Sequence, residues 1–237
     1  MIVSFGTGKK TPQTTSSASA YASGTQSLYG VWDWDMGSWN TKTKTNAPMN
    51  TLTGTVTLST SNLQVQTVSV ISTATSLRTV SNTAICWQGS SDCGSNNTRY
   101  GWYLNLPTSS EQVIYSPVLY QGALIVNTTI PANNTPLNCG SDLDSGWTMA
   151  ISIGSGGSFA QSFFADSTGK FVNYAGTVVS GMQLAAVGSP SVVTAGPTGG
   201  SRSPYLVSQT SSGTGDVHKI NPPGGTTGAR ITWQQIR

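Results

Sequence analysis

The stretch 101–131 constrains the fold of this chain more than any other part of the sequence. Apolar and polar residues alternate with period two over 101–106 and again over 123–130, while 112–120 is rich in β-branched and aromatic residues. A Gln-Gly pair at 121–122 separates the last two segments, and a glycine-containing break of this kind is typical of a hairpin. The stretch therefore predicts three consecutive strands, and similar chemistry continues on both sides of it.

Shorter segments of the same kind recur along the rest of the chain. They lie at 2–5, 26–35, within 51–80, and at 146–153, 204–209 and 230–237. Turns rich in glycine and proline separate them, and no long helical periodicity is present. Short strands at near-regular spacing predict an all-β sandwich, barrel or propeller. We therefore expect one β domain over 1–237, with a flexible Ser/Thr-rich loop near 11–25.

A Gly-Trp pair opens two of these segments. Gly101-Trp102 and Gly146-Trp147 each begin an alternating apolar strand. Their separation along the chain matches the roughly 40–50 residues of a four-stranded propeller blade. Among the all-β architectures, this repeat favours the propeller.

Charged residues are scarce in this chain. Charged residues make up 8% of the sequence, against roughly 25% in typical soluble domains, and the formal net charge is +3. Basic residues are scattered from Lys9 to Arg237, so no basic stripe predicts binding of nucleic acid or anionic lipid. No apolar run approaches the roughly 20 residues of a membrane span. Charge-poor sequences rich in serine, threonine and asparagine are common among secreted proteins.

The three cysteines are Cys86, Cys93 and Cys139. Cys86 and Cys93 bracket a short polar loop, and we expect a disulfide there, which requires an oxidising compartment; two free thiols are the alternative. Cys139 is then left over, either as a free thiol or with a partner in another chain. The start at Met1 lacks the basic and apolar regions of a secretory signal, so we expect an extracellular version of this chain to be a fragment or a mature piece.

Groups suited to catalysis are few. His218 is the only histidine and Glu111 the only glutamate, so neither a nucleophile oriented by histidine nor a pair of glutamates is expected. We expect His218 to be a solvated residue of a polar loop. Asp142 and Asp144 are the residue type that a glycosidase pair needs, but a solvated loop is the favoured interpretation. The chain is therefore expected to act without catalysis.

An aromatic cluster is the candidate ligand-binding site. It consists of Tyr29, Trp32, Trp34 and Trp39 beside Asp33, Asp35 and Asn40, and the three tryptophans and two aspartates are the candidate ligand-binding residues. Exposed tryptophan beside carboxylates suits carbohydrate or peptide recognition, because the rings supply flat apolar area and the polar groups supply directional hydrogen bonds. The alternative is that these alternating rings pack between propeller blades, and this interpretation is favoured over ligand binding.

Five segments, in this order, resemble the C-terminal half of the PilC/PilY family of type IV pilus biogenesis factors and tip-associated adhesins. They are FGTGK at 5–9, QSLYGVWD at 26–33, the block at 101–131, the cysteine-containing loop and GWTM at 139–149, and the terminal RITWQQIR. Residues 36–84 and 158–200 match the family only loosely.

This resemblance implies a quinoprotein-like, modified seven-bladed β-propeller, of which the chain would supply the C-terminal blades or a shortened version. It also implies a non-enzymatic protein that supports pilus assembly and adhesion to host or abiotic surfaces. Such a protein would contact minor pilins at the pilus tip, outside the cell. A carbohydrate-binding domain or a quinoprotein-like enzyme on the same architecture is the alternative, although the sequence shows no cluster of cofactor ligands.

The sequence departs from the family pattern in two respects. Family members often carry a calcium loop of alternating acidic residues, but the pairs Asp33/Asp35 and Asp142/Asp144 lack the glycine and distal glutamate of such a loop. The Arg-Gly-Asp tripeptide that some members present to host integrins is also missing. No cofactor, calcium included, is therefore expected for this chain.

Overall fold

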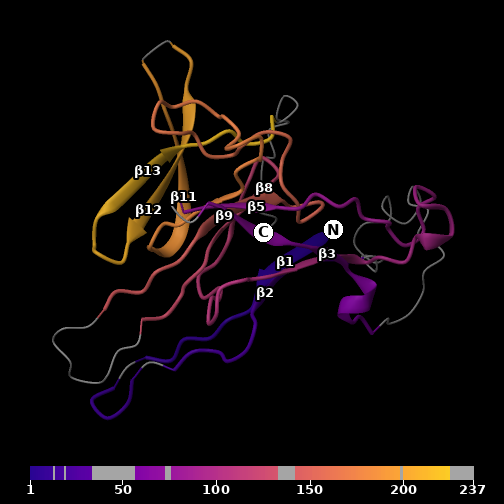
Figure 1. The fold of residues 1–237 in the computed structure, drawn as a ribbon, viewed down its shortest axis with the longest axis horizontal. Coiled ribbons are helices and arrows are strands. Elements are labelled where there is room, and N and C mark those ends of the chain that lie inside the picture. The colour runs from indigo at the N-terminus through magenta and orange to yellow at the C-terminus, as the bar shows by residue number, and fades with distance from the viewer. Residues whose placement is uncertain are drawn as a thin grey trace, which may run out of the picture.

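The computed structural model describes residues 1–12, 14–18, 20–33, 57–72, 76–132, 142–197 and 200–224. Within these ranges the regular structure consists of thirteen β-strands and two single-turn 3₁₀ helices, η1 (Thr60–Asn62) and η2 (Gly94–Asn96). The all-β expectation is therefore confirmed. The strands form three open sheets, and Figure 1 shows β11, β12 and β13 on one side of the molecule and β1, β2 and β3 on the other.

The first sheet has four strands in the order β1-β2-β6-β3. β1 (Ile2–Gly6) pairs antiparallel with β2 (Ser27–Trp32), which in turn pairs antiparallel with β6 (Gly101–Asn105). β3 (Gln64–Gln66) runs parallel to β6. Four segments far apart in the sequence thus meet in one sheet.

The second sheet has six strands, all paired antiparallel with their neighbours. Its order is β4 (Val68–Ser72), β5 (Leu77–Val80), β10 (Gly181–Met182), β9 (Thr148–Ser152), β8 (Ala123–Asn127) and β7 (Val118–Tyr120). The third sheet is an antiparallel meander of β11 (Ala186–Ala195), β12 (Ser203–Thr210) and β13 (Gly215–Lys219).

The six-stranded sheet is covered on both faces, which explains why every residue of β8 is buried. Leu124 and Val126 belong to a core shared with the four-stranded sheet, which contributes Trp102. Ala123 and Ile125 belong to a second core, shared with the three-stranded sheet. Alternation along β8 therefore separates two cores from each other, where in a half-exposed strand it separates a core from solvent.

The three consecutive strands expected within 101–131 are present as β6, β7 and β8, but they are divided between two sheets. β6 belongs to the four-stranded sheet, whereas β7 and β8 form a hairpin in the six-stranded sheet. The expected strand 112–120 shrinks to its last three residues, and Gln112 forms only an isolated bridge with Thr129. Pro117 stands directly before β7, and a proline cannot donate a hydrogen bond to a strand ladder.

The turn between β7 and β8 follows the sequence prediction. Gln121 and Gly122 both adopt positive φ, at 47° and 83°. Two consecutive residues with positive φ are what a tight two-residue hairpin loop requires, because this conformation matches the twist of the flanking strands.

In both Gly-Trp pairs a buried ring follows a glycine in close backbone contact: Gly101-Trp102 opens β6, and Gly146-Trp147 lies directly before β9. A side chain at Gly101 would collide with the carbonyl of Gly30, and one at Gly146 would collide with the carbonyl of Thr128. The tryptophan that follows each glycine is buried in the core between the four- and six-stranded sheets. Each glycine therefore allows the backbone of another segment to come close, and the ring of the next residue is buried beside this contact. The propeller that this repeat favours remains a prediction, because the described sheets of four, six and three strands do not show a ring of four-stranded blades.

Cys86 and Cys93 form the disulfide expected from the sequence, with their Cα atoms 5.6 Å apart. Cys139 and the expected terminal strand 230–237 lie outside the described residues. Among the residues that the structure describes, no helix has the length and apolar composition needed to cross a membrane.

Candidate binding surface

The outer face of the four-stranded sheet carries a row of aromatic and aliphatic side chains. Along β2, Leu28 belongs to the core, so the alternation of a strand turns Tyr29 to the opposite face. The register places Phe5 and Tyr103 on either side of Tyr29, and Val65 next to Tyr103. One residue from each of the four strands thus contributes to a continuous row.

The rings in this row stack on one another. The ring centroids of Phe5 and Tyr29 are 5.2 Å apart and those of Tyr29 and Tyr103 are 6.1 Å apart, with planes inclined by 20° in both pairs. Such aromatic pairs contribute about 0.5–1.5 kcal/mol each beyond the burial of their area. Neighbouring rings therefore cover both faces of Tyr29 and one face each of Phe5 and Tyr103, and a partner would mainly contact the ring edges. Phe5 and Val65 are 44% and 42% exposed.

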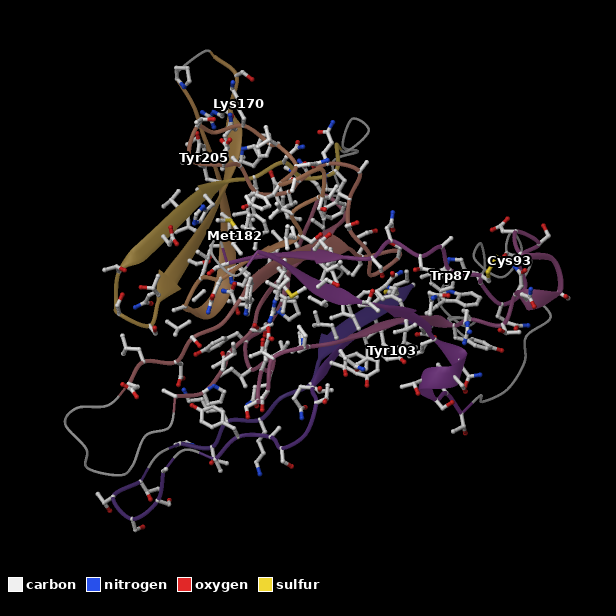
Figure 2. The ribbon with its side chains drawn as sticks, viewed as in Figure 1. Trp87, Cys93, Tyr103, Lys170, Met182 and Tyr205 are labelled. Carbon is white, nitrogen blue, oxygen red and sulfur yellow. A yellow bond between two sulfur atoms is a disulfide. The ribbon has the colours of Figure 1, made fainter. Side chains whose placement is uncertain are left out.

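We call this surface the aromatic face, defined by the outward residues Val3, Phe5, Tyr29, Val31, Val65 and Tyr103. None of these six side chains is charged at neutral pH. At one end of the face the Ser27 hydroxyl donates a hydrogen bond to the Asn105 side chain. Contiguous exposed apolar area marks interaction sites on soluble proteins. Tyr103, labelled in Figure 2, shows where this face lies in the molecule.

Two members of the predicted tryptophan–aspartate cluster lie within the described residues. Trp32 ends β2 on the core-facing side of the sheet, and its ring meets Trp87 edge to face, with centroids 6.1 Å apart and planes at 82°. Asp33 exchanges backbone hydrogen bonds with Met1. The contact of Trp32 agrees with the packing interpretation, and ligand binding at this cluster stays a prediction. Trp34, Asp35 and Trp39 lie outside the described residues.

The structure gathers Phe5, Tyr29 and Tyr103, of which only Tyr29 belonged to the aromatic cluster predicted from the sequence. The signal was present in the strands themselves. Each of the two tyrosines alternates with buried residues, at positions where the solvated face of an antiparallel sheet usually carries polar side chains. The pairing that unites the three rings joins segments far apart in the chain, so it was not readable from local pattern.

A second candidate site is a polar cleft of about 320 Å³. Asp144 accepts hydrogen bonds there from the Lys10 ammonium and the Tyr21 hydroxyl, both at 3.3 Å, and from the Ala132 N–H at 2.9 Å. Asp142 lines the same cleft. The expectation that the acidic pair lies in a solvated loop is therefore wrong for Asp144, because three donors hold a side chain that is only 17% exposed.

Burial and hydrogen bonding shift the pKa values of two groups in this cleft. Burial raises the pKa of Tyr21, because it disfavours the phenolate. Burial acts to lower the pKa of Lys10, but hydrogen bonds to Tyr21 and Asp144 favour the ammonium form and the net shift is upward. At neutral pH the three side chains therefore tie together segments that are distant in sequence. This arrangement differs from one that activates a nucleophile or a base.

The lone glutamate belongs to an ion pair, and the lone histidine lies beside a carboxylate. His218 lies on β13 and not in the expected polar loop, and its Nε2 is 3.1 Å from a carboxylate oxygen of Asp216. Glu111 is fully buried and accepts two hydrogen bonds from the Arg78 guanidinium, at 2.6 and 2.8 Å, and one from the Thr128 hydroxyl. Among the described residues, no group of three or more His, Cys, Asp or Glu side chains is placed to hold a metal ion.

No protein-family model matches this sequence, and no curated protein matches it. A similar solved structure is the crystal structure of the PilY1 C-terminal domain from Pseudomonas aeruginosa. The match covers 94% of this chain, with a TM-score of 0.57 and 21% sequence identity. It covers 42% of the PilY1 chain, so this chain spans less than half the length of that domain. The chain therefore has a PilY-like fold, shared with part of the PilY1 C-terminal domain.

Proposed function

We propose that this chain is a non-enzymatic binding module of a type IV pilus protein, exposed at the pilus tip or the outer-membrane surface. The observation that carries the proposal is the fold shared with the PilY1 C-terminal domain over 94% of the chain. The sequence segments that resemble the PilC/PilY family agree with it. The Cys86–Cys93 disulfide agrees as well, since structural disulfides persist in oxidising compartments.

We further propose that the three sheets are consecutive blades of a quinoprotein-like β-propeller. Face-to-face stacking supports this, because the six-stranded sheet shares one core with each of its two neighbours. Blades arranged radially around a central channel pack against one another in the same way. The Gly-Trp pairs also fit, since both bury their ring in the core between two adjacent sheets.

Within this module, the aromatic face is the proposed contact with a pilus partner. Its six side chains are uncharged, so burying them against an apolar protein surface desolvates no ion. Burial there would contribute about 25 cal/mol for each Å² of apolar area removed from water. Minor pilins are the proposed partners in pilus assembly. Adhesion to host or abiotic surfaces is proposed for the whole protein, and neither nucleic acid nor a cofactor has a part in it.

The chemistry of the acidic groups supports a role without catalysis. Asp144 is held by three hydrogen-bond donors, and Glu111 is paired with Arg78 in the interior. A carbohydrate-binding domain or a quinoprotein-like enzyme stays the alternative. The stacking of the rings favours a protein partner over a sugar, because a sugar packs on the flat face of a ring and stacking covers both faces of Tyr29 and one face each of Phe5 and Tyr103.

Co-purification with minor pilins tests this proposal. The immobilised chain should retain purified minor pilins at physiological salt, and retention should change little as salt is raised, because the contact is apolar. An absorbance scan of the same preparation should show no bound quinone. Failure to retain any minor pilin would contradict the pilus role, and a stoichiometric quinone spectrum would favour the enzyme alternative.

A further inference from the structure

Among the residues that the structure describes, β1 is an edge strand whose outward backbone groups have no strand partner. In the described sheets it pairs with β2 alone. Met1 exchanges both backbone hydrogen bonds with Asp33 at the start of this ladder, and hydrogen-bonded pairs then alternate with non-hydrogen-bonded pairs along it. The N–H and C=O groups of Ile2, Ser4 and Gly6 therefore point away from β2, toward the free edge.

The described sheets have six edges, and five of them carry a feature that discourages pairing with another chain. β3 and β7 are only three residues long. β4 and β11 each contain a register shift, and β13 carries Asp216, His218 and Lys219. β1 has none of these features, because its sequence IVSFG contains no charge and no proline and its register with β2 is unbroken.

A groove of about 260 Å³ lies along the open edge of β1. Ser4, Phe5 and Gly6 form one wall, and residues 113–117 form the other. The Ser4 hydroxyl is buried there, and no hydrogen-bond partner for it is present among the described residues. At Gly6 the two walls meet, because a side chain on this glycine would collide with Val113. The groove is therefore open toward the start of β1.

We propose that β1 accepts an extended segment of a partner polypeptide in this groove, which adds a strand to the four-stranded sheet. Backbone N–H and C=O groups at a two-residue spacing recognise another strand, because only an extended backbone repeats its own groups at that spacing. The incoming strand is uncharged. Its apolar side chains lie beside Val3 and Phe5 and extend the aromatic face, and a small hydrogen-bonding side chain lies near Ser4. This edge site adjoins the face proposed above to meet minor pilins and shares Phe5 with it.

Hydrogen exchange of the Ser4 amide tests the proposal with a synthetic, uncharged heptapeptide of alternating threonine and valine as the probe. Saturating peptide should slow exchange of this amide by at least about tenfold. The Val3 amide, which faces β2, should change little. The same peptide with N-methyl groups on the amides that would face β1 keeps its side chains but cannot pair, and it should not protect Ser4. Unchanged exchange at Ser4, or equal protection by the N-methylated peptide, would overturn strand addition.

Ser4→Pro is the matching change in the protein. The Ser4 N–H takes no part in pairing with β2, and proline is tolerated at strand edges, so the variant should keep the unfolding midpoint of the wild type. Loss of one hydrogen bond and obstruction of the edge should weaken binding of the unmodified peptide by roughly tenfold or more. A folded Ser4→Pro variant that binds as tightly as the wild type would contradict the proposal. If the variant does not fold, the comparison of the two peptides on the wild-type protein decides the matter.

Discussion

The two sheets that flank the six-stranded sheet differ in what they leave exposed. Each buries one face against it. The four-stranded sheet presents a row of stacked, uncharged rings on its other face, whereas the outer face of the three-stranded sheet places Lys219 next to Tyr205, among the exposed Val193 and Val217. Charged side chains suit lasting exposure to water, and a row of rings suits burial against a partner. The outer faces of the two flanking sheets lie in equivalent positions, but their side-chain chemistry indicates different roles.

The largest effect is expected where the four-stranded sheet meets the core. Trp102 and Tyr103 are neighbours in β6 but point to opposite faces, and Trp102 is fully buried. Trp102→Ala should lower the free energy of unfolding by about 3–5 kcal/mol, because it leaves a large cavity. Tyr103→Ser should lower it by less than about 1.5 kcal/mol, since only ring stacking on the aromatic face is lost. Urea unfolding of both variants measures this, and equal losses would mean that the aromatic face is part of the core.

Charged contacts offer a second contrast, between the interior and the three-stranded sheet. Glu111→Ala leaves the Arg78 charge buried without its partner and should lower the free energy of unfolding by about 3 kcal/mol or more. Asp216→Ala removes the partly exposed partner of His218 on β13 and should cost less than about 1 kcal/mol. Thermal or urea unfolding compares the two, with the double change Arg78→Met/Glu111→Leu as a control that should recover much of the first loss. A larger loss of unfolding free energy from Asp216→Ala than from Glu111→Ala would contradict this comparison.

The disulfide should have an intermediate effect. Cys86 and Cys93 close a short loop beside Trp87, whose ring contacts Trp32 at the end of β2. The double change Cys86→Ser/Cys93→Ser should lower the free energy of unfolding by about 2–3 kcal/mol, because the unfolded chain regains the freedom that the short loop had removed. Peptide mapping without reduction should recover both cysteines in one linked species from the wild-type protein. Two alkylatable thiols in protein purified under oxidising conditions would contradict the pairing.

The smallest effect should come from alkaline pH at the polar cleft. The folded state raises the pKa values of both Lys10 and Tyr21. Their contribution to stability is therefore complete below the pKa values of the unfolded chain, about 10 for both residue types, and is lost as pH rises through the higher folded values. Thermal unfolding between pH 8 and pH 11 should show a decline above about pH 10. Tyr21→Phe should reduce the part of that decline that comes from the tyrosine, and an unchanged profile in this variant would contradict the assignment.

Local pattern predicted much of the secondary structure. The segments 2–5, 26–35, 146–153 and 204–209 coincide with or overlap β1, β2, β9 and β12, and the turn before β8 lies where the Gln-Gly pair predicted it. These successes share a cause, because period-two alternation and turn chemistry are properties of a few consecutive residues. The prediction for 112–120 was wrong in extent, since β-branched and aromatic composition also suits an irregular segment that packs under a neighbouring sheet.

The candidate site depended on information that local pattern does not contain. The row of Phe5, Tyr29 and Tyr103 arises from pairing between strands that lie far apart in the chain. The buried pair of Arg78 and Glu111 likewise joins distant segments, and a charged residue in an otherwise polar stretch gives no sign that it will be buried. The tryptophan cluster was predicted as a candidate ligand-binding site because its members are close in sequence, although Trp32 faces the core side of the sheet.

The most direct test of the contrast between the two outer faces is the binding of minor pilins to two matched double variants. Phe5→Ser/Tyr103→Ser removes rings from the aromatic face. Val193→Ser/Val217→Ser removes side chains of the three-stranded sheet that are 47% and 59% exposed. We expect the first variant to lose at least about tenfold in affinity, as loss of aromatic anchors does at interfaces, and the second to bind within about twofold of the wild type. Equal binding by both variants, or selective loss in the second, would contradict the claim that the aromatic face is the contact surface.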